Sequence, residues 1–121
     1  MEKLSIQEEE AMQLIWKNSG GFVKELLDSM PDPKIPYTTL ASTLKNLERK
    51  GFVKSVKYAN AYRYEPVVSD QEYKRGFMNG FVSEYFRNSY KELVSFFAKE
   101  EKISAHELKE IIKMIDEQDK D

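Results

Sequence analysis

Residues 37–66 read YTTLASTLKNLERKGFVKSVKYANAYRYEP, and this stretch decides the fold that we predict. In its first part Leu40, Leu44 and Leu47 recur at helical spacing, which indicates a helix with one buried stripe. Gly51 then ends the helix, and two short segments with the alternation and aromatic content of strands follow. A polar-faced helix followed by a hairpin is the order expected of the third helix and wing of a winged helix-turn-helix.

The turn of the predicted hairpin is formed by Ala59 and Asn60. A tight turn between strands needs backbone with positive φ, and no glycine is available here to supply it. Asn tolerates this conformation better than Ala does. We therefore expect Asn60 to adopt the left-handed conformation.

Three tyrosines of the hairpin, Tyr58, Tyr62 and Tyr64, have two possible uses. They could stack on bases as a single-strand platform does. We expect instead that alternation places all three on one face of the hairpin, where they pack against the helices.

The N-termini of the other helices can be recognised from the capping-box pattern Ser-x-x-Glu. The pattern occurs four times, each time before a periodic apolar run. The pattern predicts helices at about 5–17, 69–88, 89–99 and 104–118. A short helix after Gly21 is stopped by Pro31, and the third helix starts at Pro36. A small first strand near Phe22 or Ile35 would complete the module.

These elements predict a mainly α fold with a small β-hairpin. Residues 1–68 would form a winged helix-turn-helix domain, and residues 69–121 would form a helical dimerisation region.

The composition narrows the function. The 121 residues include no cysteine and one histidine, with no Gly-rich phosphate loop and no metal-ligand cluster, so we expect no enzyme, no metal and no cofactor. No stretch resembles a signal peptide or a membrane span, which leads us to expect a cytoplasmic protein.

Charge is distributed unevenly along the chain. From Lys34 to Arg63 there are seven cations and one anion, hence +6, although the whole chain carries -2. A local field of this sign attracts a polyanion such as double-stranded DNA.

The exposed side of the third helix and the hairpin supply the candidate DNA contacts. Residues near the start of such a helix reach base edges, and later cations meet phosphates. The candidate base-reading residues are Thr38, Thr39, Ser42 and Asn46. The candidate phosphate contacts are Lys45, Arg49, Lys50, Lys54, Lys57, Asn60 and Arg63.

Aromatic residues are concentrated in the second half of the chain, where eight of the fifteen fall within residues 73–97. An apolar surface of this size is normally covered by a partner, most often in a two-fold homodimer. The predicted interface comprises Tyr73, Phe77, Phe81, Tyr85, Leu108, Ile111, Ile112 and Ile115. The alternative is one larger domain in which these helices fold back on the winged module.

Taken together, four segments resemble the penicillinase-repressor family of bacterial transcription regulators. They are SIQEEEAMQLIW, YTTL...TLKNLERKGFV, AYRYEPVVSDQEY and LVSFFAKEEKISAHELKEI. The resemblance covers nearly the whole chain and implies a dimeric repressor bound to a dyad operator. Asn46 and Asn60 stand where the family commonly has Arg, and Ala59 stands where it commonly has Gly.

The resemblance also implies a route of release. Relatives that respond to β-lactams are similar in being cleaved by a membrane-embedded zinc protease, at a bond that here joins Phe96 and Phe97. Phe96 stands where an Asn is common. The copper-responsive branch needs cysteine ligands, which this chain lacks.

We therefore expect a homodimeric transcriptional repressor that binds a dyad-symmetric operator through helix 36–50 and wing 52–66. A signal that disrupts or cleaves the dimerisation region would release it. The alternative is a winged-helix module that binds protein without sequence-specific DNA recognition.

Overall fold

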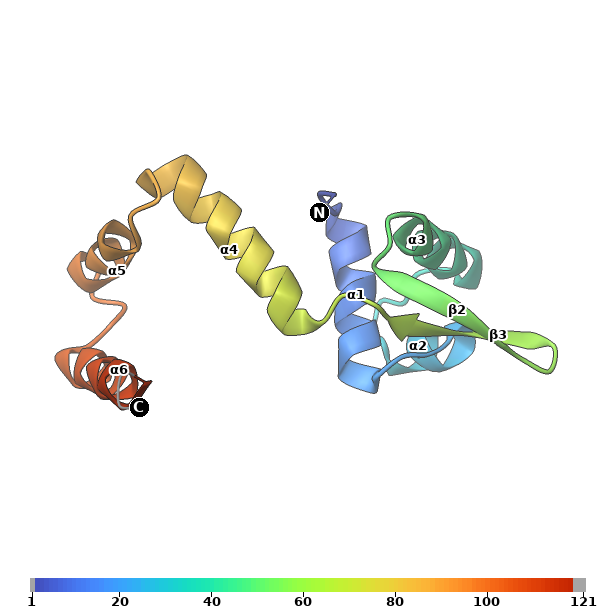
Figure 1. Ribbon diagram of the computed structural model, residues 1–121. Helices are drawn as coiled ribbons and strands as arrows, with labels where there is room; N and C mark the ends of the chain where they lie inside the picture. Colours follow the sequence, from blue (N-terminus) through green and yellow to red (C-terminus); the bar gives the residue numbers. More distant parts are fainter. Residues whose placement is uncertain (1, 119–121) are drawn as a thin grey trace. The chain divides into compact units, whose positions relative to one another are not determined.

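The computed structural model describes residues 2–118 of the chain (Figure 1). It divides into two compact units, Met1–Gly76 and Phe77–Asp121. The division falls inside a helix, eight residues after the boundary at residue 68 that the sequence predicts. The first two turns of this helix therefore belong with the N-terminal unit.

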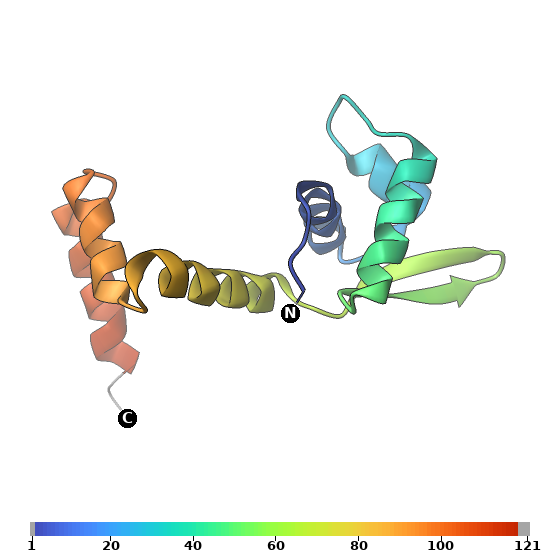
Figure 2. The same cartoon turned by 90° about the horizontal axis from the view of Figure 1, so that it is seen from above.

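The N-terminal unit is a winged helix-turn-helix, with helices on one side of a small sheet (Figure 2). The sheet is antiparallel in the order β1-β3-β2, and β1 is the short first strand that the sequence left unplaced near Phe22 or Ile35. The elements are α1 (Ile6–Asn18), β1 (Gly21–Phe22), α2 (Val23–Ser29), α3 (Tyr37–Arg49), β2 (Val53–Tyr58) and β3 (Ala61–Pro66).

Helix α1 begins as the capping-box pattern predicts. The backbone N–H of Glu8 donates to Ser5 Oγ at 3.1 Å, and the Ser5 N–H donates to Glu8 Oε1 at 2.8 Å. Two orphan amides of the first turn are thereby satisfied by residues three apart. Ser19, in the left-handed conformation, ends the helix.

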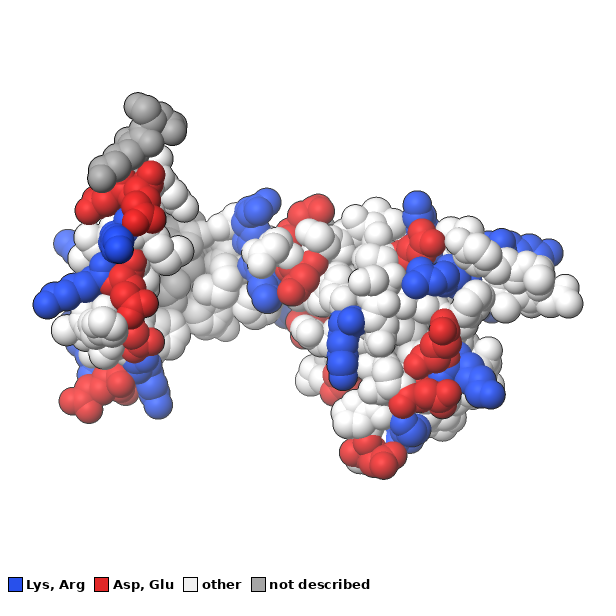
Figure 3. Space-filling view, turned by 90° about the horizontal axis from the view of Figure 1, so that it is seen from below, with Lys and Arg blue, Asp and Glu red and all other residues white. Residues whose placement is uncertain are grey.

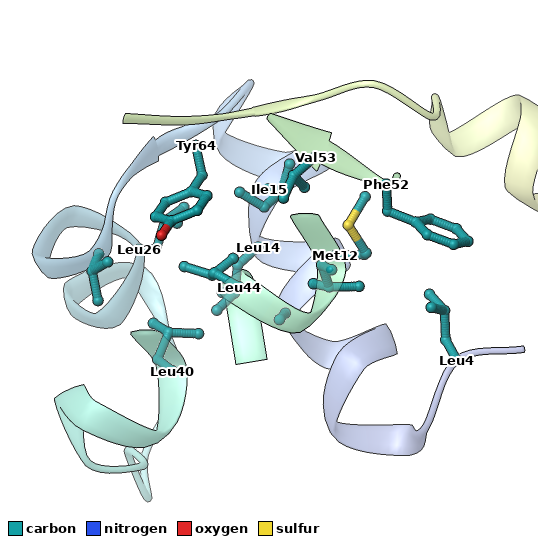
Figure 4. Packing of buried hydrophobic residues seen from close by; sticks show 13 residues of the cluster. Leu4, Met12, Leu14, Ile15, Leu26, Leu40, Leu44, Phe52, Val53 and Tyr64 are labelled. Carbon is teal, nitrogen blue, oxygen red and sulfur yellow. The ribbon is translucent and has the colours of Figure 1, made fainter. Parts of the chain in front are cut away.

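The core of this unit lies between the three helices and the inner face of the hairpin (Figure 4). Leu40 and Leu44 approach it from α3, and Tyr64 points into it from β3 (Figure 4). Its buried members are Leu4, Ala11, Met12, Leu14, Ile15, Val23, Leu26, Leu40, Leu44, Leu47, Phe52, Val53 and Tyr64.

The hairpin differs from the sequence prediction in two respects. Ala59, with φ 52°, adopts the left-handed conformation that was expected of Asn60. In addition, Tyr62 and Tyr64 lie on one face while Tyr58, which pairs with Ala61, lies on the other. The prediction for Tyr58 was wrong because it continued the alternation of side chains through the turn. The face on which Tyr58 lies relative to Tyr62 depends on how the two strands pair across that turn.

Helix α4 (Asp70–Phe86) is attached to the N-terminal unit through its first turns. The ring centroid of Tyr73 lies 5.6 Å from that of Trp16 and 6.0 Å from that of Phe52. The Tyr73 hydroxyl donates to Glu9 Oε2 at 2.6 Å, and Trp16 Nε1 donates to the Val68 carbonyl at 2.9 Å. Tyr73, predicted for the dimer interface, instead packs against the core of the winged unit, so we remove it from the interface set.

The C-terminal unit consists of the rest of α4, α5 (Tyr90–Lys99) and α6 (Ala105–Gln118). A chain of ring contacts runs from Phe77 through Phe81 and Phe86 to Phe96. Among its described residues only Val82 and Leu93 are buried. The unit is therefore held together by partly exposed aromatic side chains and has little interior of its own.

Within residues 2–118, no helix has both the length and the apolar character needed to cross a membrane.

Candidate DNA-binding surface

Helix α3 presents a polar stripe to solvent. Leu40, Leu44 and Leu47 are buried on its inner side, while Thr38, Ser42 and Asn46 follow one another at four-residue spacing on its exposed side. Hydroxyl and amide side chains on one helix face suit hydrogen bonding to base edges. Thr39, the fourth predicted base-reading residue, is half-buried, and its carbonyl accepts from the buried Thr43 hydroxyl at 2.8 Å.

The start of α3 is built differently from the start of α1. Its N-cap is Pro36, which makes no side-chain cap, and its first turn contains no acidic residue. The positive end of the helix dipole and its unsatisfied amides are thus left uncompensated by the chain itself. Such a terminus favours a phosphate as its partner.

Three of the predicted phosphate contacts are exposed cations that lack an ion pair among the described residues. Lys45 and Arg49 lie on α3, and Lys57 lies near the tip of the hairpin. Among the residues that the structure describes, none of the three has a carboxylate within 4.0 Å. Their charges are therefore available to an external anion.

Lys50 is used differently. Its Nζ lies 2.7 Å from Glu8 Oε1, with side-chain exposures of 15% for Lys50 and 7% for Glu8, and it also donates to the Lys3 carbonyl. Burial alone would raise the pKa of Glu8, but hydrogen bonds from Lys50 and Ser5 outweigh it and lower the pKa. Lys50 is therefore part of the structure of the domain, which argues against its predicted role as a phosphate contact.

Arg63 and Lys54 lie on the face of the hairpin opposite to Lys57. Arg63 Nη2 donates to the Ser19 carbonyl at 3.2 Å, and Glu65 lies 3.7 Å from Arg63 and 3.9 Å from Lys54. Since Glu65 neutralises much of this face, we assign the predicted wing contact with phosphate to Lys57 in preference to Arg63 and Lys54. Asn60 lies exposed in the turn itself.

Gly20 makes room for this arrangement of Arg63. Its φ is +91°, and a Cβ atom there would lie 2.6 Å from the Tyr64 carbonyl oxygen and 2.7 Å from Arg63 Nη1. Any larger residue would displace the guanidinium or strain the strand pairing.

Glu48, which the sequence shows only as the lone anion of the basic segment, has a structural role in positioning the hairpin. Its Oε2 accepts from the backbone N–H of Ser55 at 3.0 Å and from the Ser55 hydroxyl at 2.5 Å. The last turn of α3 is thereby tied to β2. A Glu preceding a strand Ser by seven residues carries no recognisable local pattern, so only the fold reveals the contact.

The charge of the N-terminal unit is not uniform over its surface. On the side seen in Figure 3, Lys and Arg are interspersed with Asp and Glu over the helices, whereas the end of the wing shows basic side chains without acidic ones. On this side of the molecule, basic side chains without acidic neighbours are therefore found at the end of the wing. In the described part of the chain, no group of three or more His, Cys, Asp or Glu side chains is placed to hold a metal ion.

Most of the predicted interface residues lie on the surface of the C-terminal unit. Phe77, Tyr85, Ile111, Ile112 and Ile115 have exposed fractions between 43% and 65%. Phe81 and Leu108 are half-buried.

Comparison with known proteins finds a family and two similar proteins. A family model described as penicillinase repressor matches residues 4–117. The penicillinase repressor of Staphylococcus aureus is 24% identical over 110 residues, which cover 90% of this chain and 87% of that protein. A solved structure of a variant of Lactococcus lactis ZitR is 15% identical, covers 96% of this chain and 75% of that chain, and has a TM-score of 0.44. The match of the family model over nearly all residues shows that the chain belongs to the penicillinase repressor family, a family of transcriptional repressors and not of enzymes.

Proposed function

We propose that the protein represses transcription as a homodimer, by placing α3 and the β2–β3 hairpin of each copy on one half of a dyad-symmetric DNA operator. The observation that carries this proposal is the exposed side of α3. There Thr38, Ser42 and Asn46 lie beside Lys45 and Arg49, two cations that have no carboxylate partner within the described residues. Base-reading groups and phosphate-binding charges on one helix are what operator recognition requires.

The types of exposed residue on α3 also support this assignment. A protein-binding helix would be expected to expose aromatic or aliphatic anchors along its centre. The exposed side of α3 carries hydroxyl, amide and cationic groups there instead, and its N-terminus is left open to an anion.

The homodimer rests on the C-terminal unit. Ile111, Ile112 and Ile115 repeat along one side of α6, and α6 has no buried residue of its own. Apolar side chains in such numbers are normally covered by a partner. A second copy supplies an identical apolar face and relates the two winged units by a two-fold axis, as a palindromic operator demands.

A signal that releases the protein from the operator would act on the C-terminal unit. Phe96 and Phe97 are 48% and 37% exposed, lie within α5, and contact each other with ring centroids 5.6 Å apart. A protease needs an extended substrate, so cleavage between them would require local unwinding of α5. A membrane-embedded zinc protease would be the partner in this step.

Binding to the DNA upstream of the gene's own operon, titrated against salt, tests the function. Specific binding predicts tight association with that duplex and weaker association with a scrambled one, with a steep fall of affinity as salt rises. Equal affinity for the two duplexes at every salt concentration would reject the proposal.

Within the operator complex, Ser42→Ala and Asn46→Ala separate base reading from general affinity. The wild-type protein should bind the operator more tightly than a variant operator with one changed base pair. We expect each substitution to reduce this difference in binding free energy by about 1 kcal/mol or more at one base-pair position. Lys57→Ala is the matched control, because loss of a phosphate contact weakens all sequences alike.

A further inference from the structure

The flank of α3 that borders the hairpin forms a second surface beside the polar stripe. At 100° per residue, Tyr37 and Glu48 lie within about 20° of each other around the helix, between its buried side and its polar side. Glu48 holds Ser55 of β2 through two hydrogen bonds. The flank therefore continues directly onto the inner face of the hairpin.

Two half-exposed tyrosines mark the two sides of this junction. Tyr37 is 53% exposed at the start of α3, and Tyr62 is 52% exposed on β3. Tyr64 is buried near them, and burial raises its pKa, with further contributions from the charges of Glu48, Tyr37 and Tyr62. The strand register sets Tyr62 and Tyr64 on one face of the hairpin, with Ser55 opposite Tyr64. Ser55 binds Glu48, which lies on the same flank of α3 as Tyr37.

A cation of the hairpin, Lys57, is also on this face. The strand register sets Lys57 directly opposite Tyr62, and residues opposite each other in an antiparallel pair project to the same side. Lys57 has no ion-pair partner among the described residues. The junction thus offers two phenol hydroxyls and a cation without an ion-pair partner among the described residues, while the Glu48 carboxylate keeps its charge and is engaged by Ser55. Neutral donors beside a cation fit a phosphate oxygen.

We propose that Tyr37 and Tyr62 position the protein on DNA by donating their phenol hydrogen bonds to backbone phosphates where a strand passes between α3 and the hairpin. This inference rests on the proposed function and adds two positioning residues to it. Tyrosine hydroxyls are among the side-chain groups that bind phosphate oxygens without reading sequence.

A neutral donor has a distinctive signature in solution. Each cation that binds a phosphate releases counterions and contributes about 0.9 to the slope of log affinity against log salt, whereas a phenol contributes nothing to it. Removing a phenol hydroxyl should therefore weaken all duplexes equally and leave the salt slope unchanged.

The test compares Tyr37→Phe and Tyr62→Phe with two controls in the full-length protein, using the upstream duplex and a scrambled duplex. Tyr58→Phe is the matched control, because Tyr58 is 51% exposed on the opposite face of the same hairpin. Lys57→Ala is the charged comparison. Thermal melting of each variant reports on folding, and the exposed phenols are expected to leave it unchanged.

We expect Tyr37→Phe and Tyr62→Phe each to weaken binding to both duplexes by about fivefold to tenfold at unchanged salt slope. Tyr58→Phe should bind like the wild type, and Lys57→Ala should lower the slope by about 0.9. Wild-type affinity in both Phe variants, an altered sequence preference, or an equal loss in Tyr58→Phe would each overturn the inference while leaving operator binding intact. If the wild-type protein does not discriminate between the two duplexes, the proposed function itself fails.

Discussion

The ammonium of Lys50 lies 2.7 Å from the carboxylate of Glu8, so the residue that follows α3 is joined to the first turn of α1. Glu8 also completes the capping box with Ser5, and Lys50 also binds the Lys3 carbonyl. This nearly buried ion pair fixes the end of α3 against the start of α1. One of the cations in the most basic stretch of the chain is therefore used in an ion pair within the fold.

Lys50→Met should lower stability without altering the way in which DNA is bound. Methionine keeps the apolar stem but leaves the Glu8 carboxylate without its partner, which costs about 2 kcal/mol. Urea unfolding measures this loss. The salt slope of DNA binding should stay at the wild-type value, and a slope lower by about 0.9 would return Lys50 to the phosphate contacts.

The stability of the winged unit should depend on pH through Glu8. Its pKa in the folded state is lowered from 4.5, so its contribution to stability is complete above that value and is lost as the pH falls through the lower folded pKa. Unfolding free energies of the wild type and Glu8→Gln should therefore converge as the solution is acidified below pH 4.5. A constant difference between them at all pH values would contradict this linkage.

Tyr73→Phe should destabilise the attachment of α4 to the winged unit by about 1 kcal/mol, because it removes the hydrogen bond to Glu9 and keeps the ring against Trp16. Tyr73→Ala should cost about 3 kcal/mol, since the packing on Phe52 is lost as well. Chemical unfolding of both variants measures the difference. Tyr58→Phe serves as the control, because its hydroxyl is exposed. If Tyr58→Phe lowered the free energy of unfolding as much as Tyr73→Phe does, the contact with Glu9 would not explain the loss of stability.

Ile112→Asp should dissociate the proposed dimer without unfolding the protein. Ile112 is 55% exposed in the single chain, so its replacement costs the isolated fold little, whereas a carboxylate buried in an apolar interface should weaken association roughly 100-fold. Sedimentation measures the change. Lys113→Asp, which lies on the opposite side of α6, should remain a dimer. A dimer in both variants would place the interface elsewhere.

Local patterns in the sequence predicted the fold with few errors. Helix starts at Ser5 and Ser89 were readable because the capping box lies within four consecutive residues. Helix α3 could be predicted because Leu40, Leu44 and Leu47 define its buried side, and the remaining positions then form its polar side. The errors arose where geometry between elements decides the outcome, as at Ala59 in the turn and at Tyr58 beyond the predicted face.

The candidate site was predictable as a set of residue types but not as a surface. Thr38, Ser42 and Asn46 follow from helical periodicity alone. Periodicity does not reveal which cations are available to DNA. Lys50 is bound by Glu8, 42 residues away, and Arg63 is bound by the Ser19 carbonyl, 44 residues away. A charge count weights all cations equally, whereas only packing shows which of them already have partners.

The sequence by itself determined the order of the elements, the polar side of α3 and the concentration of apolar residues in the second half of the chain, since these depend on spacing within a few residues. The tertiary structure decided which charges remain free among the described residues, that Tyr73 belongs to the winged unit, and that Tyr62 and Lys57 share one face of the hairpin. Those properties depend on contacts between residues far apart in the chain, and such contacts exist only once the helices and the hairpin have packed around their common core.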